Sequence, residues 1–355
     1  MSAYQNAIAA ITHQASQSDV SGRPGRLAAG WAKVEIVPPA GTPLAGYGNR
    51  RGAPSTGTRD PIWVKALALS DGQDTAVIVG SDMLIVPENI ADAVRERVSD
   101  QAGVLPNAVL FNASHSHSGP GGFAPGYLAA QFAGPYAPEV EAHLVDVFAR
   151  AITDAVRSVA PAALAHGKIE ETAYIRNRTR AAPTDSTLNY LVVQRDDGTR
   201  CYAIRYSAHA TVLGGSNMQF SGDYPGFLQR AIEGETGAFA LFLAGAVGSM
   251  GPKPPDRPDD LAKAHAMGEA LAARVLDAAR DIEFRENVEI GCIGVPIALP
   301  AFQLRIGRRW RLSPLFLIMA GLDRDGWLHA VRIGDAVLCG FPADFSGESA
   351  NDLQA

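Results

Sequence analysis

The sequence predicts an α/β protein with mixed β-sheets and flanking helices. Two observations support this prediction: apolar segments of strand length alternate with amphipathic segments of helix length, and two hairpins join successive strands directly. Hairpins add antiparallel neighbours to a sheet, whereas helical crossovers join parallel strands. The expected sheets are therefore mixed. No apolar run reaches the length of a membrane-spanning helix.

The first half of the chain predicts two strands and two helices. Residues 75–86 (TAVIVGSDMLIV) and 107–114 (NAVLFNAS) are too apolar for strands with one face in water, so we expect them to be buried. Residues 87–98 begin with a proline, which is typical of a helix start. Residues 138–159 repeat an apolar residue every fourth position, which predicts a long amphipathic helix.

The second half predicts two hairpins separated by further strands and helices. Residues 189–209 form the first hairpin, with its turn at Asp197-Gly198. The elements expected after it are a helix (223–233), a strand (238–245), a long helix (259–282) and a hairpin (327–334 with 336–342). Ser346 is expected to cap one more helix. The chain stops before that helix could be long, so the helix is vestigial or the chain is part of a longer polypeptide.

Composition limits the classes of function. We expect residues 1–28 to be a weakly ordered or helical leader and residues 29–355 to be a single domain, with C-terminal truncation as one interpretation. The net charge of −6 argues against a nucleic-acid partner. The three cysteines form no disulfide framework, and the first residues lack a secretory signal pattern. A cytoplasmic protein is therefore expected, with an unknown oligomeric state.

The segment from Phe111 to Phe123 (FNASHSHSGPGGF) places two histidines beside a glycine-rich turn. On a strand, His115 and His117 would point to the same face. The carboxyl end of a strand in an open α/β sheet is a common ligand site. The two imidazoles could share a metal, or one could bind while the other moves protons. Structural histidines that cap the turn are the alternative, and the short pattern leaves both open.

Two further residues strengthen the metal hypothesis. His209 ends the apolar segment CYAIRYSAH beside another glycine turn, and Asp344 follows the last predicted strand. Two histidines and one carboxylate are a common catalytic zinc shell, which leaves one position open for water. Asp82, after the first buried strand, is expected either to orient a ligand histidine or to cap the next helix.

The segment ASHSHSGPGGF resembles the THTHSGPGG signature of the neutral, non-lysosomal ceramidases. The resemblance extends, in the same order, over nearly the whole chain from about residue 30. The blocks that carry it are GYG (46–48), VGSDMLIV (79–86), YIRNRTR (174–180), YSAHATVL (206–213), FLAGAVGSMGP (242–252) and GFPADFS (340–346).

The resemblance implies a ceramidase-like amidase fold with one Zn²⁺ per chain. The implied reaction is hydrolysis of a linear amide, such as the N-acyl bond of a ceramide-like lipid, by metal-activated water. His115 and His209 would be zinc ligands, and Asp344 would replace the family's ligating Glu. His117 would contact substrate or move protons, and Arg178 would hold the substrate or oxyanion.

The sequence also departs from the family pattern. The family's serine aligns with Gly251, so Ser249 is only a nearby candidate nucleophile, and metal-bound water is preferred. Glu348 is a second candidate for the carboxylate ligand. The family's tyrosine ligand and its C-terminal sandwich domain lie beyond the end of this chain.

Two other functions stay open beside the leading one. The first is hydrolysis of a different amide or ester on the same scaffold, and the second is a non-catalytic relative that binds metal or lipid. The expected partner is a small-molecule or lipid amide, with no nucleic acid and no transmembrane segment. The basic and apolar residues 305–319 are expected to contact a membrane surface transiently or to form a basic surface strand.

Overall fold

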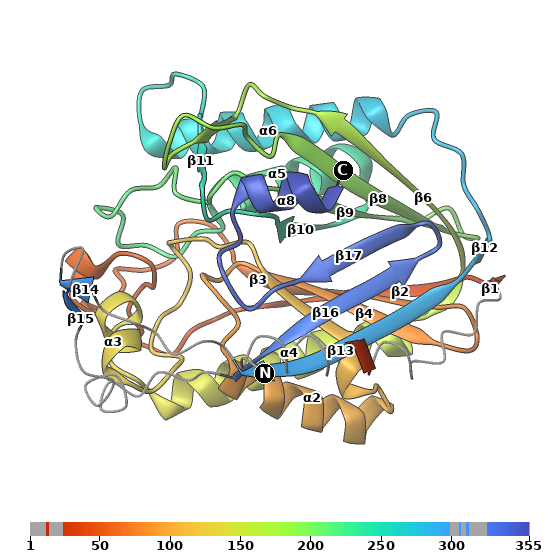
Figure 1. Cartoon of the computed structure of the whole chain (residues 1–355), viewed down its shortest axis with the longest axis horizontal. Helices are drawn as coiled ribbons and strands as arrows, with labels where there is room; N and C mark the ends of the chain where they lie inside the picture. The colour runs from red at the N-terminus through yellow and green to blue at the C-terminus, as the bar shows by residue number, and fades with distance from the viewer. Residues whose placement is uncertain (1–11, 14–23, 299–304, 307–309, 312–324, 355) are drawn as a thin grey trace.

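The computed structural model of the chain is shown in Figure 1. It describes residues 12–13, 24–298, 305–306, 310–311 and 325–354. Most of the predicted leader and most of the basic segment 305–319 lie outside these residues. Strands begin at Gly25, four residues before the predicted domain boundary. No helix among the described residues is both long enough and apolar enough to cross a membrane.

The main sheet has eight strands in the order β10-β9-β8-β6-β2-β3-β4-β5. The β4–β5 and β9–β10 pairs are parallel and the other neighbours are antiparallel, so the predicted mixed sheet is confirmed. The strands are β2 (Ala28–Glu35), β3 (Trp63–Ser70), β4 (Thr75–Ser81), β5 (Val109–Ala113), β6 (Ala160–Glu170), β8 (Thr187–Arg195), β9 (Arg200–Tyr206) and β10 (Phe239–Ala244).

A second sheet of three antiparallel strands packs on one face of the main sheet (Figure 1). It contains β13 (Ile290–Ala298), β16 (Asp325–Ile333) and β17 (Ala336–Gly340), and the β16–β17 turn confirms the second predicted hairpin. Three two-stranded ribbons make up the remaining sheets of the described residues: β1 (Gly25–Arg26) with β12 (Asn287–Val288), β7 (Ile175–Asn177) with β11 (Met250–Pro252), and β14 (Arg305–Ile306) with β15 (Trp310–Arg311).

Helices cover the other face of the main sheet in two separate pairs. The pairs lie on opposite sides of the molecule, because the sheet curls until its edge strands β5 and β10 meet (Figure 1). Helices α2 and α4 pack on β2–β5, and α5 and α6 pack on β8–β10. The helices are α2 (Glu88–Ala102), α3 (Tyr127–Ala133), α4 (Pro138–Arg157), α5 (Asp223–Thr236), α6 (Asp260–Ala278) and α8 (Gly347–Gln354), with 3-10 turns η1 (Gly48–Arg50) and η2 (Pro106–Ala108). The helices predicted at 87–98, 138–159, 223–233 and 259–282 are confirmed.

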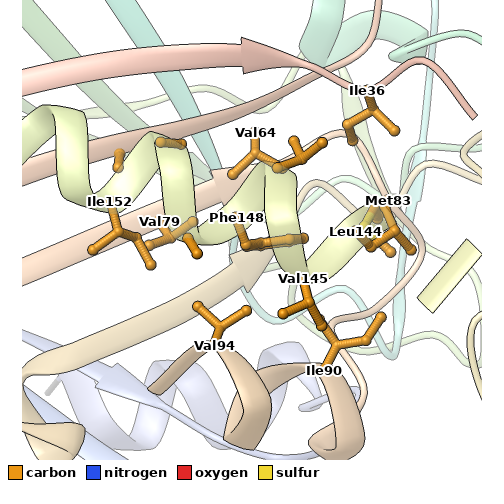
Figure 2. Packing of buried hydrophobic residues seen from close by; sticks show 14 of the residues in the cluster. Ile36, Val64, Val79, Met83, Ile90, Val94, Leu144, Val145, Phe148 and Ile152 are labelled. Carbon is orange, nitrogen blue, oxygen red and sulfur yellow. The ribbon is translucent and has the colours of Figure 1, made fainter. Parts of the chain in front are cut away.

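The alternation of side chains along the strands produces this arrangement. On β3, Val64 points into the cluster under α2 and α4, whereas Leu67 points into the cluster under the three-stranded sheet. Figure 2 shows the first cluster, where Phe148 and Leu144 of α4 pack against β-strand residues such as Val79. Both faces of the central strands are apolar because each face is covered.

The two edge strands of the main sheet, β5 and β10, contact each other. The side chain of Asn112 on β5 joins them: its Nδ2 donates to the carbonyl of Ala244 at 3.0 Å, and its Oδ1 accepts from the amide of Ala244 at 2.8 Å. Lys65 on β3 also donates to the carbonyl of Ala240 at 2.7 Å. This contact brings the loop after β5 close to the loops after β9 and β10.

The C-terminal helix begins as its sequence predicts. Ser346 precedes α8, and its Oγ accepts a hydrogen bond from the amide of Ser349 at 3.2 Å. This is the side-chain capping bond expected at a helix start. One predicted strand is shorter than expected, because β4 ends at Ser81 rather than at residue 86.

His329 on β16 provides a test of the packing under the second sheet. It is 8% exposed, stacks on Trp327, and its Nε2 has no hydrogen-bond partner among the described residues. Burial, with the charge of Arg95 nearby, lowers the pKa of His329 to about 4. The unfolded chain therefore binds more protons between pH 6.5 and 4, and stability is lost as the pH falls through this window.

The free energy of unfolding of the parent should fall between pH 7 and pH 5. We expect this fall to be smaller by about 2 kcal/mol in His329→Gln. Urea unfolding at the two pH values measures the effect, with His265→Gln as the control because His265 is exposed on α6. An equal pH dependence of stability in the parent and in His329→Gln would contradict the lowered pKa of His329.

Candidate metal centre

His115, His117 and His209 form one group, called here the histidine cluster. His115 and His117 lie on the loop after β5, and His209 lies on the loop after β9. The prediction that His115 and His117 share a strand face is wrong, because the β4–β5 ladder ends at the Ser81–Ala113 pair. His115 instead has a left-handed backbone, with φ of 61°. Such a backbone is uncommon for a residue other than glycine and occurs often at functional sites.

The ring nitrogens of the histidine cluster point toward one another. One ligand nitrogen from each ring lies within 4.8 Å of the others. The Nε2 atoms of His117 and His209 are 2.8 Å apart, and the His115 and His209 ring centroids are 4.4 Å apart. Three converging imidazoles are a known ligand set for zinc in catalytic sites. The donor set therefore fits a metal ion, while the identity of the metal is not fixed by it.

The cluster is electrically neutral near pH 7. Burial, followed by the charges of the neighbouring rings, lowers the pKa of His117 to about 2. Burial and His115 lower the pKa of His209 to about 3. The pKa of His115 is also lowered, again mainly by burial. A neutral imidazole is the form that binds a metal, so no proton has to leave these rings first.

Backbone carbonyl groups hold two of the three rings. The Nδ1 of His209 is 3.1 Å from the carbonyl oxygen of Val247, which lies on the loop after β10. His115 makes a hydrogen bond to the backbone of Leu84. A histidine whose second nitrogen donates to a carbonyl presents its other nitrogen as a lone pair, which is the usual support for a metal ligand. The Nδ1 of His117 is buried and has no partner among the described residues.

Asp344 lies next to the cluster but outside it. Its Oδ2 is 3.6 Å from the Nε2 of His115, and its side chain is half exposed. The backbone around it is held against the loop after β10, because the amide of Gly248 donates to the carbonyl of Phe345 at 2.9 Å. The predicted carboxylate is thus brought to the site.

Arg178 follows β7 and has an exposed side chain beside the same loop. Its Nη2 donates to the carbonyl of Gly248 at 3.2 Å, and its amide donates to the carbonyl of Ser249 at 2.8 Å. Its positive charge is one of the causes, after burial, that lower the pKa of each cluster histidine. The structure therefore places a cation next to the cluster with donors facing solvent.

Ser249 and Glu348 are hydrogen-bonded to each other. The Oγ of Ser249 donates to Glu348 at 3.1 Å and accepts from the amide of Gly347 at 2.9 Å. Glu348 also accepts from Asn177 at 3.2 Å and from Arg180 at 2.9 Å. The Arg180 hydrogen bond is the main cause that lowers the pKa of Glu348 to about 2. Ser249 and Glu348 therefore join α8 to the loop after β10. The Glu348 carboxylate accepts hydrogen bonds from three side chains and is held away from the histidine cluster by them.

Asp82 has partners other than those expected from the sequence. It is buried, accepts from the amide of Trp63 at 2.9 Å, and lies 3.3 Å from the Nε2 of Gln229. The N-terminus of α2 has no side-chain capping bond. Asp82 thus joins β3 to α5.

Sequence reasoning missed three residues that contact His117. Gly46, Tyr47 and Arg50 lie on the loop between β2 and β3. The only sequence signal was the GYG turn, which carries no chemistry of its own. Their contacts span more than sixty residues of chain, so no local pattern reveals them.

A mixed α/β fold with a buried cluster of neutral histidines at its loop ends defines a protein with a candidate metal site. Residues 28–242, more than half of the chain, match the sequence profile of the family described as "Neutral/alkaline non-lysosomal ceramidase, N-terminal". The chain belongs to this family, which confirms the resemblance of the H-x-H-S-G-P-G-G motif.

Known relatives agree with this assignment. A neutral ceramidase of Mycobacterium tuberculosis is 26% identical over 192 residues, which cover 49% of this chain and 30% of the relative. The crystal structure of neutral ceramidase from Pseudomonas aeruginosa has the same fold, with a TM-score of 0.79 at 18% identity, over 92% of this chain and 64% of that one. A structure described as ceramidase complexed with C2 matches with a TM-score of 0.79 at 17% identity, over 92% and 65% of the two chains. This chain therefore spans about a third of the mycobacterial relative and just under two thirds of the solved structures.

Proposed function

We propose that the chain is a zinc-dependent hydrolase that cleaves a linear amide of the ceramide type into a carboxylic acid and an amine. One observation carries this proposal: three neutral histidines of a ceramidase-family chain direct their nitrogens to a common point. Bound zinc would act as a Lewis acid that polarises the amide carbonyl and makes water more acidic.

The geometry favours all three cluster histidines as zinc ligands. The sequence assigned His117 to substrate contact or proton transfer, and that assignment stays a prediction. Burial lowers the pKa of this ring to about 2, so near pH 7 it is neutral and has a lone pair that can bind a metal. Its Nε2 also lies within the group of converging nitrogens. Three protein ligands leave the open position that a catalytic zinc requires.

Asp344 is well placed to act as the general base instead of as a ligand. Its carboxylate lies 3.6 Å from His115 and keeps one half of its surface in solvent. In this role it would take the proton that the attacking water loses, and would return it to the nitrogen of the leaving amine. Arg178, with donors facing solvent, would bind the carbonyl oxygen as negative charge develops on it.

An apolar acyl group has a candidate contact beside Asp344. Phe341 and Phe345 stack with their ring centroids 4.3 Å apart and flank this residue in sequence. Phe341 is 37% exposed, which is unusual for a ring in a structural core. This pair supports a lipid amide over a small polar one.

The direct test is release of fatty acid from an N-acylsphingosine by the zinc-loaded chain. Parallel assays with a fatty-acid ester and with an N-acyl amino acid separate the leading function from hydrolysis of another amide or ester. Turnover of the sphingosine amide that is lost with a chelator and restored with zinc is expected. Zinc binding without turnover of any of the three would favour the non-catalytic relative. A cytoplasmic location stays a prediction.

The base and ligand roles of Asp344 give different results in Asp344→Asn. We expect this variant to lower kcat roughly 10²–10⁴-fold, as for loss of a general base, while it retains zinc within about threefold of the parent affinity. Glu348→Gln is the matched control, because Glu348 lies on the same segment but binds Asn177, Arg180 and Ser249. Loss of zinc from Asp344→Asn would instead support the ligand role predicted from the sequence.

A further inference from the structure

The loop from Pro43 to Arg50 lies against both loops that carry the histidine cluster. Its backbone bonds to the loop after β5, where the amide of Ala45 donates to the carbonyl of Gly119 at 3.0 Å. Its Tyr47 hydroxyl donates to the carbonyl of Leu213 at 3.2 Å, on the loop after β9. The two histidine loops are thus tied to a common third element.

The His117 ring rests directly on this loop. Gly46 has a φ of 104°, and a Cβ built on it would lie 2.5 Å from both Cγ and Nδ1 of His117. The Tyr47 ring lies on the same imidazole, with centroids 4.8 Å apart. Only glycine at position 46 leaves room for the ring where it is.

Arg50 holds the backbone of the same residue. Its Nη1 donates to the carbonyl of His117 at 2.6 Å and to the carbonyl of Ala45 at 2.8 Å, and its guanidinium lies 4.8 Å from the Tyr47 ring centroid. Arg50 is only 5% exposed, and its Nε and Nη2 have no hydrogen-bond partner among the described residues. No carboxylate bonds it in that part of the chain. Burying a cation without a carboxylate partner costs folding free energy. The position of Arg50 and its two hydrogen bonds to carbonyl groups therefore need a reason other than fold stability.

We propose that Gly46, Tyr47 and Arg50 are positioning residues that fix the His117 imidazole in the cluster, so that metal affinity depends on this loop. The proposal rests on the proposed function for its metal. The physical argument is that residues supporting a ligand from behind set its orientation, and their loss typically lowers metal affinity roughly 10–100-fold.

The first test compares Gly46→Ala with Gly41→Ala. Both glycines have a left-handed backbone, with φ of 104° and 87°, so both substitutions carry a similar backbone strain. A Cβ at Gly41 meets nothing within 4 Å, whereas one at Gly46 collides with His117. We expect zinc affinity, measured by competition with a chromophoric chelator, to fall at least tenfold in Gly46→Ala only. An equal fall in both variants would overturn the proposal.

The second test separates position from charge at residue 50. Arg50→Lys keeps the positive charge but loses the planar group that stacks on Tyr47 and bonds two carbonyls. We expect lower zinc affinity in both Arg50→Lys and Arg50→Met. Arg51→Lys is the control, because Arg51 directly follows this loop and is exposed. If Arg50 affected the site only by repelling the metal ion, Arg50→Met would bind zinc more tightly than the parent. Arg50→Lys would then bind zinc as tightly as the parent does. That result would overturn the proposal.

A third measurement needs neither zinc nor turnover. The imidazole NMR signals of the metal-free chain report the His117–His209 contact, in which the two Nε2 atoms are 2.8 Å apart. We expect these signals to shift in Gly46→Ala and Arg50→Lys and to stay in place in Gly41→Ala. Unchanged signals in both loop variants would refute positioning, whereas a parent that binds no zinc would refute only the proposed function. If Gly46→Ala fails to fold, the zinc affinity and the imidazole signals of Arg50→Lys test the proposal instead.

Discussion

His209→Ala is expected to lose both zinc and amide hydrolysis. The variant removes one of the three nitrogens proposed as metal ligands, and the two that would remain are too few to hold an ion tightly. Because the loss of a residue behind a ligand already costs about 10–100-fold in affinity, the loss of a ligand should cost more than 100-fold. We expect kcat/KM to fall roughly 10³-fold or more at equal zinc concentration. Calorimetric zinc titration and the sphingosine-amide assay measure the two effects.

The control for this variant is His265→Ala. His265 lies on α6, is exposed and pairs with Glu269, so its loss should change neither quantity. Circular dichroism of the metal-free variants shows whether each one is folded. A folded His209→Ala that keeps the zinc affinity of the parent would remove His209 from the metal site.

Arg178→Met is expected to lower kcat/KM roughly 10²–10³-fold and to leave zinc affinity unchanged. The reason is that Arg178 contributes donors and charge beside the cluster, while none of its atoms belongs to the ligand group. Loss of a single group that stabilises an oxyanion has an effect of this size. Arg178→Lys should recover only part of the rate, because an ammonium group cannot bind an oxygen in the forked geometry of a guanidinium.

Arg176→Met is the matched control for Arg178. Arg176 lies on β7 two residues earlier, is exposed, and bonds only weakly to the carbonyl of Pro252. Steady-state kinetics with the sphingosine amide should place it near the parent. If Arg178→Met instead releases zinc, or if both variants lose activity equally, the oxyanion role of Arg178 is wrong.

Local patterns predicted most of the elements. The two hairpins and the four long helices follow from apolar periodicity and turn residues, which act within a few positions of the chain. The histidines were found because each follows an apolar strand beside a glycine turn. Their orientation was not predicted, since the left-handed backbone of His115 depends on where the β4–β5 ladder stops.

The contacts that assemble the site are distant in sequence. Asn112 joins β5 to β10 across 132 positions, and Glu348 reaches Asn177 across 171. The Arg50–His117 bond spans 67 positions. No local propensity encodes such pairs, because they form only when the sheet brings its edges together. The sequence could still place Asp344 and His117 in one site. The roles given to them there, Asp344 as a metal ligand and His117 in substrate contact or proton transfer, came from the family resemblance and stay predictions.

The most direct test of the central claim is the metal content of the purified chain. Mass spectrometry is applied to protein prepared without added metal and again after zinc is offered, for the parent, His115→Ala and the His265→Ala control. The account predicts about one zinc per chain in the parent and the control, and less than a tenth of that in His115→Ala. A parent that holds no metal even after zinc is offered would contradict it.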